Sequence, residues 1–309
     1  MKIYIAFDFI DGPSGGGNQF LKNLHDEFFK KDVYCNDPGQ ADVILFNGHH
    51  NPNEIGRLKN KFSNKFFVHR IDGVYKLYNR LTDIRQDISF KMNEAFSDAT
   101  VFQSKWAYTE LIKQGLNLQN KPNRVISNAA DNKVFFSCPS YLTREHSDKI
   151  NIVSTGWSDN PNKGTSFYNY LDSHLDFSKY TLTFIGNSPT KFKNAKSILP
   201  LNREDLANEL RSKDIFFFPS KYECCSNSLI EGISCGLIAI ALNSGGNIEI
   251  INRCSAGVLF DNKEDLICKI QEISYNIKER RERITPPVLD IISNQYINFF
   301  KRCIESTLA

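Results

Sequence analysis

Two carboxylates around the start of one helix are the side chains of this sequence best placed to do chemistry. Glu223 and Glu231 are separated by seven residues, and the polar triplet at 226–228 between them can cap a helix. The first amides of a helix have no helical acceptor and carry partial positive charge, so they can bind a diphosphate. A glutamate on either side can accept hydrogen bonds from neutral hydroxyls. The spacing fits a nucleotide sugar, whose ribose and sugar hydroxyls flank a pyrophosphate; the alternative is two ordinary solvent-exposed glutamates.

A β-α-β unit is expected to position these carboxylates. An apolar strand at 215–219 leads into the loop that holds Glu223, and an apolar helix follows from the capping triplet. Gly236 stands where it can end that helix. A second buried strand is expected at 237–242, followed by a Gly-Gly turn and another helix start.

The segment 216–251 resembles the donor-binding signature of retaining GT-B glycosyltransferases of family four. The resemblance rests on the two glutamates, the Pro-Ser pair after the strand and the Gly-rich turn. It implies that Glu223, as a catalytic residue, contacts the hydroxyls of the donor sugar and that Glu231 contacts the ribose. The family often has Gly-aromatic-Gly where this chain has Cys-Cys-Ser, which predicts a different shape for this turn. The backbone amides implied in phosphate binding are those of Cys225, Ser226, Asn227 and Ser228.

The segment that opens the second half of the chain adds a cation. A strand is expected to end at Gly156, and Lys163 follows a turn built from Ser, Asp, Asn and Pro. A lysine there can hold a diphosphate as a point charge, and the resemblance gives Lys163 that catalytic role. The family has an arginine after the glycine, where this chain has Trp157; Arg70 is a candidate to replace that cation, and Trp157 can stack on a ring instead. The donor-side residues implied in this part of the chain are Gly156, Trp157 and Asn187.

Strands and helices alternate in the first half as well, which predicts a doubly wound, mostly parallel sheet. Ligands bind beyond the carboxyl ends of the strands in such sheets. His69 is expected at such an end, and a matching histidine in the family touches the transferred sugar, so the resemblance implies a catalytic role. The same rule favours acceptor-side roles for Arg70, Asp72 and His49. A glycine-rich loop follows the first strand, and the resemblance brings it close to the donor phosphate through Gly15, Gly16 and Gly17.

The predicted architecture is α/β with the GT-B fold: two Rossmann-like domains, each a doubly wound parallel sheet, facing across a cleft. An acceptor-side domain is expected at 1–138, a linker at 139–149 and a nucleotide-sugar-binding domain at 150–288. The resemblance implies that a last helix, at 289–309, crosses back to the first domain.

Composition excludes several other classes of function. The chain has 38 basic and 35 acidic residues, a net charge of +3, and lacks the concentrated basic footprint of a nucleic-acid binder. Its eight cysteines form no CxxC pair, so no zinc site is predicted and a reducing cytosol is expected. The run KERRER at 278–283 is a solvated helix face or, alternatively, a contact with an anionic membrane surface.

The resemblance implies a retaining glycosyltransferase that moves a sugar from a nucleoside diphosphate to an acceptor hydroxyl, without a metal or another cofactor. Two alternatives stay open at this point. One is a nucleotide-sugar epimerase on the same fold, and the other is a non-catalytic nucleotide-sugar binder, which the tryptophan at 157 favours. A nicotinamide oxidoreductase is disfavoured because the first glycine turn lacks GxGxxG.

Overall fold

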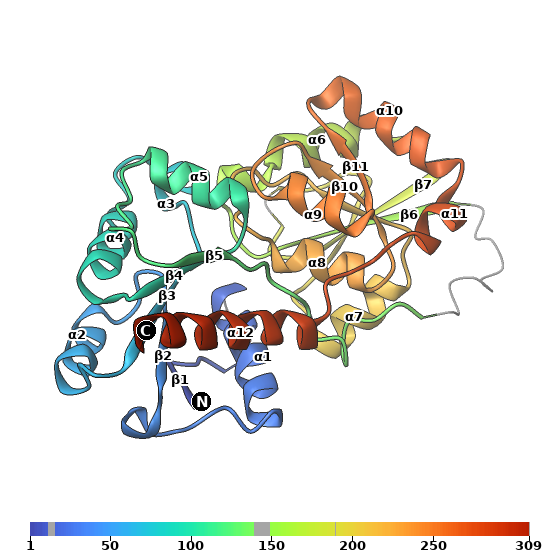
Figure 1. Cartoon of the computed structure of the whole chain (residues 1–309). Helices are drawn as coiled ribbons and strands as arrows, with labels where there is room; N and C mark the ends of the chain where they lie inside the picture. The colour runs from blue at the N-terminus through green and yellow to red at the C-terminus, as the bar shows by residue number, and fades with distance from the viewer. Residues whose placement is uncertain (12–15, 139–148, 189, 309) are drawn as a thin grey trace. The chain divides into compact units, whose positions relative to one another are not determined.

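The chain folds as two compact units, each built around one parallel sheet (Figure 1). A computed structural model describes residues 1–11, 16–138, 149–188 and 190–308. Unit 1 comprises Met1–Ala129 and Val288–Ala309, and unit 2 comprises Ala130–Pro287. Both sheets are parallel throughout and carry helices on both faces, which confirms the predicted doubly wound α/β class.

The sheet of unit 1 has five strands in the order β1-β2-β3-β4-β5. Strands follow one another in sequence and in space, so every carboxyl end lies at one edge of the sheet. The elements are β1 (Ile3–Ala6), α1 (Gly16–Lys30), η1 (Pro38–Gln40), β2 (Val43–Asn47), α2 (Pro52–Lys61), β3 (Phe66–Ile71), α3 (Tyr75–Tyr78), α4 (Ile84–Phe96), β4 (Ala99–Phe102), α5 (Lys105–Lys113), β5 (Asn123–Val125) and α12 (Leu289–Leu308).

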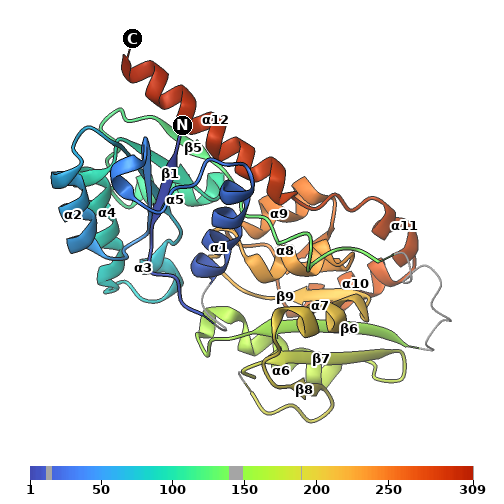
Figure 2. The same cartoon turned by 90° about the horizontal axis from the view of Figure 1, so that it is seen from below.

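Alternating strand residues divide the core of unit 1 between two faces. Ile3, Val43 and Leu45 pack under α1 and α12, together with Tyr296 of the last helix. Ile44 and its neighbours on the other face pack against α2 and α4. Figure 2 shows α1 on one side of this sheet and α2 with α4 on the other. The last helix therefore belongs to the core of unit 1, at the far end of the chain from β1.

The sheet of unit 2 has six strands in the order β11-β10-β9-β6-β7-β8. Strand β9 pairs with β6 on one side and β10 on the other, so the organising strand of the sequence lies in the middle of the sheet. The elements are β6 (Ile150–Gly156), η3 (Pro161–Lys163), α6 (Thr165–His174), β7 (Tyr180–Gly186), β8 (Lys196–Ile198), α7 (Arg203–Arg211), β9 (Ile215–Phe218), α8 (Asn227–Ser234), β10 (Ile238–Leu242), α9 (Asn247–Cys254), β11 (Gly257–Phe260), α10 (Lys263–Ser274) and α11 (Ile277–Glu282).

The apolar run of β9 serves both faces of this sheet. Phe216 and Phe218 pack towards α7, α8 and α9, while Ile215 and Phe217 pack towards α6 and α10. A strand that is buried on both faces needs a continuous apolar sequence, which is why this segment does not alternate with polar residues.

The division between the units falls earlier than the predicted boundary at 138. Ala130 and Phe135 pack in the core of unit 2, so the segment after Ala129 belongs to that unit. Of the predicted linker at 139–149, residues 139–148 lie outside the described residues.

The KERRER run lies in and beside α11, which is separate from α10 before it. The chain leaves helical geometry at Asn276, whose φ is −141°, and α11 restarts there. Arg281 then turns inward and donates to the Lys213 carbonyl at 2.6 Å. Arg280 and Arg283 pair with Glu272 and Glu279. The KERRER run therefore offers less free positive charge than its sequence indicates.

None of the described helices combines the length and the apolar character needed to cross a membrane.

Candidate active site

The loop between β9 and α8 holds Glu223, and the polar triplet after it starts the helix as predicted. Ser226 is the N-cap, and its Oγ accepts from the Leu229 amide at 3.4 Å. The same Oγ lies 3.0 Å from Oγ of Ser228. The amide of Ser228 donates to no acceptor within the part of the chain that the structure describes. This end of α8 keeps donor capacity for an anion.

Lys163 comes to this loop because β6 and β9 are neighbours in the sheet. It ends the turn η3, and Gly164 follows with φ of +88°. A Cβ at Gly164 would lie 2.6 Å from Cβ of Pro219, so only glycine lets this turn pack against the end of β9. The Lys221 amide also donates to the Asn162 carbonyl at 2.7 Å. These contacts hold the lysine loop against the glutamate loop.

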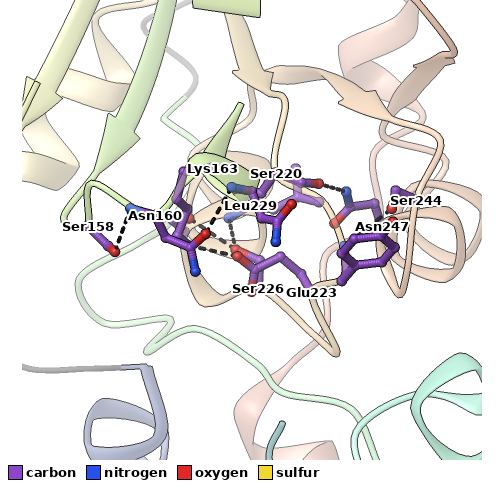
Figure 3. A network of polar contacts seen from close by, with 12 residues as sticks. Ser158, Asn160, Lys163, Ser220, Glu223, Ser226, Leu229, Ser244 and Asn247 are labelled. Carbon is purple, nitrogen blue, oxygen red and sulfur yellow. Dashed lines mark hydrogen bonds and ion pairs between the residues drawn. The ribbon is translucent and has the colours of Figure 1, made fainter. Parts of the chain in front are cut away.

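Lys163 and Glu223 form an ion pair. Nζ of Lys163 lies 2.7 Å from Oε1 of Glu223 (Figure 3). The side chains are 24% and 17% exposed, so the pair is accessible but partly shielded from solvent. The fold thus brings together Lys163 and Glu223, the two residues for which the sequence predicted roles in the same transfer reaction.

The Gly-Gly turn after β10 supports the backbone of this loop. The Gly246 amide donates to the Glu223 carbonyl at 2.7 Å, and a Cβ at Gly246 would lie 2.0 Å from the Cys224 carbonyl oxygen. Tyr222 has a φ of +58°, which is uncommon for a residue other than glycine, and its amide donates to Ser244 Oγ at 3.2 Å. Glu223 therefore stands on a loop whose backbone is fixed by a second loop (Figure 3).

Asn247 completes this support and was missed by the sequence reasoning. Its side chain is fully buried, and Nδ2 donates to the carbonyls of Ser220 and Leu242 at 2.9 and 3.1 Å. These bonds tie the start of α9 to the ends of β9 and β10. The sequence signal that could have identified Asn247 is its position directly after the Gly-Gly pair, where a helix start was expected.

The carboxyl group of Glu231 differs from that of Glu223. The residue is partly exposed, and its carboxyl group accepts no hydrogen bond from the described residues. Partial burial raises the pKa of Glu231 to about 7, against the opposing effect of the Arg203 guanidinium. Arg203, which the sequence did not single out, also lies 3.3 Å from Oδ2 of Asp131. A partly buried carboxylate without a donor is suited to a hydroxyl or diol supplied by a ligand.

The remaining donor-side residues of β6 and β7 lie at the carboxyl ends of these two paired strands. The Asn187 amide donates to the Gly156 carbonyl at 2.9 Å, and its side chain donates to the Trp157 carbonyl at 3.1 Å. Trp157 is 51% exposed and Asn187 is exposed as well. Their predicted contacts with a nucleotide stay predictions.

The side chain of Cys225 is part of the core of unit 2 rather than of an open site. Only its backbone amide is left for the predicted role. Asn227 and Ser228 are partly exposed, so their first-turn amides stay the predicted phosphate ligands.

His69 does not offer the direct catalytic contact predicted for it. The ring is fully buried, stacks on Phe46 at 4.4 Å, and has both nitrogens hydrogen-bonded. Nε2 donates to the Gly48 carbonyl at 2.8 Å, and Nδ1 accepts from Asn93 at 3.1 Å. Burial lowers the pKa of His69 to about 4, so the ring is neutral at pH 7. Its geometry suits a residue that positions the loop after β2.

Arg70 and Asp72 form a polar cluster at the carboxyl edge of unit 1. Arg70 is fully buried and donates to Asn47 at 2.6 Å and to Asn128 at 2.8 Å. Asn47 in turn donates to Asp72 at 2.7 Å, and Tyr75 donates to the other carboxylate oxygen. Burial of Asp72 opposes its ionisation, but Arg70 and these hydrogen bonds hold its pKa below the usual value. The guanidinium of Arg70 is therefore hydrogen-bonded inside unit 1. These contacts do not support the prediction that Arg70 takes the place of the family's phosphate-binding arginine at position 157.

Gly17 and His49 lie near the same cluster. A Cβ at Gly17 would lie 2.7 Å from Oδ2 of Asp72, so α1 begins in close contact with this carboxylate. Gly16 is the first residue of α1, whereas Gly15 lies outside the described residues. His49 is partly exposed, and burial lowers the pKa of its ring.

The described residues contain no group of three or more His, Cys, Asp or Glu side chains arranged to hold a metal ion.

Comparisons with known proteins agree with this geometry. Residues 182–286, within unit 2, match the family described as glycosyl transferases group 1. The whole chain is similar to the sucrose-phosphate synthase of Thermosynechococcus elongatus, with a TM-score of 0.76, 15% identity and 99% of each chain covered. The chain has the GT-B fold. No curated protein sequence matches it.

Two further solved structures similar to this chain contain nucleotide ligands. One is HepE of Anabaena in complex with UDP-glucose, with a TM-score of 0.70, 14% identity and 99% of each chain covered. The other is the catalytic domain of starch synthase IV from Arabidopsis thaliana, bound to ADP and acarbose. Its TM-score is 0.64 at 11% identity, over 94% of this chain and 79% of that one.

Proposed function

We propose that this chain is a glycosyltransferase that moves a sugar from a nucleoside diphosphate sugar to an acceptor hydroxyl, with retention at the anomeric carbon and without a bound metal. The observation that carries the proposal is the juxtaposition of Lys163 with Glu223 on the loop that leads into α8. Similar structures that contain UDP-glucose or ADP support a nucleotide ligand for this fold.

The charges at this loop are suited to the leaving group. In the transfer, the bond between the anomeric carbon and the phosphate oxygen breaks, and a bond to the acceptor oxygen forms. The diphosphate gains negative charge as it leaves, and Lys163 with the first amides of α8 would stabilise that charge in a preorganised way. The leaving phosphate oxygen takes the acceptor proton, so no protein base is required.

Glu223 and Glu231 are proposed to recognise the two neutral ends of the donor. Glu223 would accept from hydroxyls of the sugar once the diphosphate competes for Lys163. Glu231 would accept from the ribose, because its partly buried carboxylate has no hydrogen-bond donor in the described chain. The polar cluster around Asp72 is proposed to lie on the acceptor side.

The test is a transfer assay with UDP-, GDP- and ADP-sugars, combined with a thermal-shift panel of the same donors. A donor that binds the folded state raises its melting temperature. Product analysis by NMR then gives the anomeric configuration, and the assay is repeated after chelation of divalent cations.

Transfer that persists with the chelator and retains the configuration supports the proposal. An inverted product contradicts retention, and loss of transfer on chelation contradicts metal independence. An isomerised nucleotide sugar formed without an acceptor would favour an epimerase.

A further inference from the structure

A cavity opens in unit 2 at the edge of its sheet, beside β7 and β8. Its volume is about 570 Å³, and small-molecule sites occupy roughly 300–1,000 Å³. The lining comes from Lys149 just before β6, from Phe177 and the first residues of β7, and from the segment 193–196 that leads into β8. Figure 2 shows β8 beside β7 at this edge of the sheet. This hollow is called the edge cavity below.

The lengths of the two strands explain why the sheet is open here. Strand β8 pairs with β7 only from Thr183 to Ile185. Among the described residues, the first three residues of β7, at 180–182, therefore have no strand beside them on that side, whereas β6 pairs with them on the other side. The edge cavity is the space left beyond the short strand.

Three lysines line the edge cavity from two separate segments. Nζ of Lys149 donates to the Phe177 carbonyl at 2.7 Å, which holds this side chain over the start of β7. Lys193 and Lys196 are exposed, and neither forms an ion pair with a carboxylate in the part of the chain that the structure describes. The described residues of the lining include no aspartate or glutamate. Such a concentration of one sign of charge in a hollow attracts anions.

A buried carboxylate fixes the segment that carries two of these lysines. Asp172 of α6 is 5% exposed and accepts from the amides of Lys193, Asn194 and Ala195 at 2.7, 3.0 and 2.7 Å. Nδ2 of Asn194 donates back to the Asp172 carbonyl at 2.7 Å. Burial of Asp172 opposes its ionisation, but these amides hold its pKa below the usual value. The segment is therefore ordered before a ligand arrives, which lowers the entropy cost of binding.

The rest of the lining suits an organic body rather than a bare ion. Phe177, Tyr180 and Leu182 pack with the core of unit 2 and give the edge cavity an apolar part. Oγ1 of Thr181 donates to Oδ1 of Asn151 at 2.8 Å, so this oxygen can accept a hydrogen bond from a ligand hydroxyl. Apolar surface with a few placed polar groups is typical of small-molecule sites.

We propose that the edge cavity binds a phosphate monoester of a small hydroxylated molecule, at a site separate from the one around Glu223. A phosphate monoester carries about −1.5 to −2 charges at pH 7. Lysines act as point charges that can surround a tetrahedral phosphate, whereas a planar carboxylate is best matched by the fork of an arginine, and the described lining has none. The open stretch of β7 is three residues long, which is short for the addition of a peptide strand.

The edge cavity and the Glu223 loop lie at opposite ends of the strands of unit 2. Lys149 precedes β6 and Tyr180 begins β7, whereas Lys163 and Glu223 follow the carboxyl ends of β6 and β9. At about 3.3 Å per residue, the two ends of β7 are about 20 Å apart. A ligand in the edge cavity would therefore not occupy the proposed donor site. The inference does not depend on the function proposed above.

The test measures binding of ribose 5-phosphate, glycerol 3-phosphate, inorganic phosphate and citrate by calorimetry at constant ionic strength. Lys193→Gln and Lys196→Gln each remove one charge from the edge cavity. Lys191→Gln is the matched control, because Lys191 is exposed on the same segment but does not line the cavity. Lys163→Gln shows whether a probe binds at the proposed donor site instead. The three lysines of this segment are exposed, so these substitutions should leave the fold intact.

Lys193→Gln and Lys196→Gln are each expected to weaken binding of the phosphate monoesters about three- to tenfold, because each removes one exposed charge-assisted contact. Lys191→Gln and Lys163→Gln should change the affinity little. Inorganic phosphate should bind more weakly through the same lysines, since it lacks an organic body. Equal losses for Lys191→Gln would overturn the inference, as would loss in Lys163→Gln alone or tighter binding of citrate than of the phosphate monoesters.

Two other results would assign the edge cavity differently. A hexaglutamate peptide that binds through Lys193 and Lys196, with no phosphate monoester bound, would make it a docking surface for an acidic peptide. If wild type binds none of the probes, the lysines serve only to keep the open edge of β7 from pairing with another strand, as charged residues do at sheet edges. Either result would overturn the inference.

Discussion

Neutralising Glu223 should strengthen the binding of a nucleoside diphosphate that lacks a sugar. Lys163 is paired with this carboxylate at 2.7 Å, so a diphosphate must compete for the ammonium group. Glu223→Gln keeps the shape of the side chain, removes the ion pair and removes a negative charge that would repel the ligand. Both effects act in the same direction.

The magnitude follows from the partial exposure of the pair. Exposed ion pairs contribute about 0.2–1 kcal/mol, and hydrogen bonds to charged groups about 1.5–3 kcal/mol. With side chains 24% and 17% exposed, the pair lies between these cases. We expect a release of about 1–2 kcal/mol, which corresponds to about 5- to 30-fold tighter binding of UDP or ADP.

Isothermal titration calorimetry with UDP and ADP measures this effect at two salt concentrations. Glu209→Gln is the matched control, because Glu209 also pairs with a lysine, Lys213 at 2.6 Å, on α7 away from the Glu223 loop. Lys163→Gln should weaken the same ligands. Turnover of the nucleotide sugar by Glu223→Gln should fall, because the proposed contact with the sugar hydroxyls is lost.

Unchanged or weaker diphosphate binding by a folded Glu223→Gln protein would refute the reasoning. It would mean that Lys163 does not meet the diphosphate, or that the glutamate contributes to nucleotide binding directly.

Three further predictions concern groups that the fold encloses. The affinity for UDP-glucose should rise as pH increases from 6 to 8, because the carboxyl group of Glu231, with a pKa of about 7, must ionise to accept from the ribose. In calorimetric titrations, Glu231→Gln should abolish this pH dependence. A wild-type affinity that does not vary with pH would contradict the proposed contact between Glu231 and the ribose. Burial lowers the pKa of His69 from 6.5 to about 4, so the folded state binds fewer protons there than the unfolded state, and this contribution to stability is complete above pH 6.5 and lost as pH falls towards 4. In urea unfolding, the loss of stability over this pH range should be smaller for His69→Gln than for wild type, each compared with its own stability at pH 7. Identical pH profiles of the two proteins would count against this contribution. Gly232→Ala should destabilise the protein by about 1–3 kcal/mol although alanine favours helices, because the new Cβ would lie 2.6 Å from the buried ring of Phe216; a raised melting temperature would show that α8 can move away from β9 without cost.

The local elements around the site could be predicted from the sequence. The apolar run of β9, the capping triplet before α8 and the glycine after it specify a β-α-β unit through interactions between residues close in sequence. The alternation of such units predicted two parallel α/β sheets, and the spacing of Glu223 and Glu231 identified one helix end as the candidate site. These features depend on periodicity, caps and turns, which short stretches of chain determine.

Contacts across the sheets could not be predicted in the same way. The pairing of Lys163 with Glu223 depends on β6 and β9 being neighbours, an order that no local pattern specifies. Burial likewise made His69 a neutral, fully bonded ring and raised the pKa of Glu231, although the sequence placed these residues only at a strand end and near a helix start.

The sequence by itself determined the kinds of side chain, their elements and the unit that carries each of them. Only the tertiary structure decided which charges are paired and which are shielded from water. The physical reason is that hydrogen-bond partners and desolvation depend on residues distant in sequence, whereas helix and strand formation depends mainly on near neighbours.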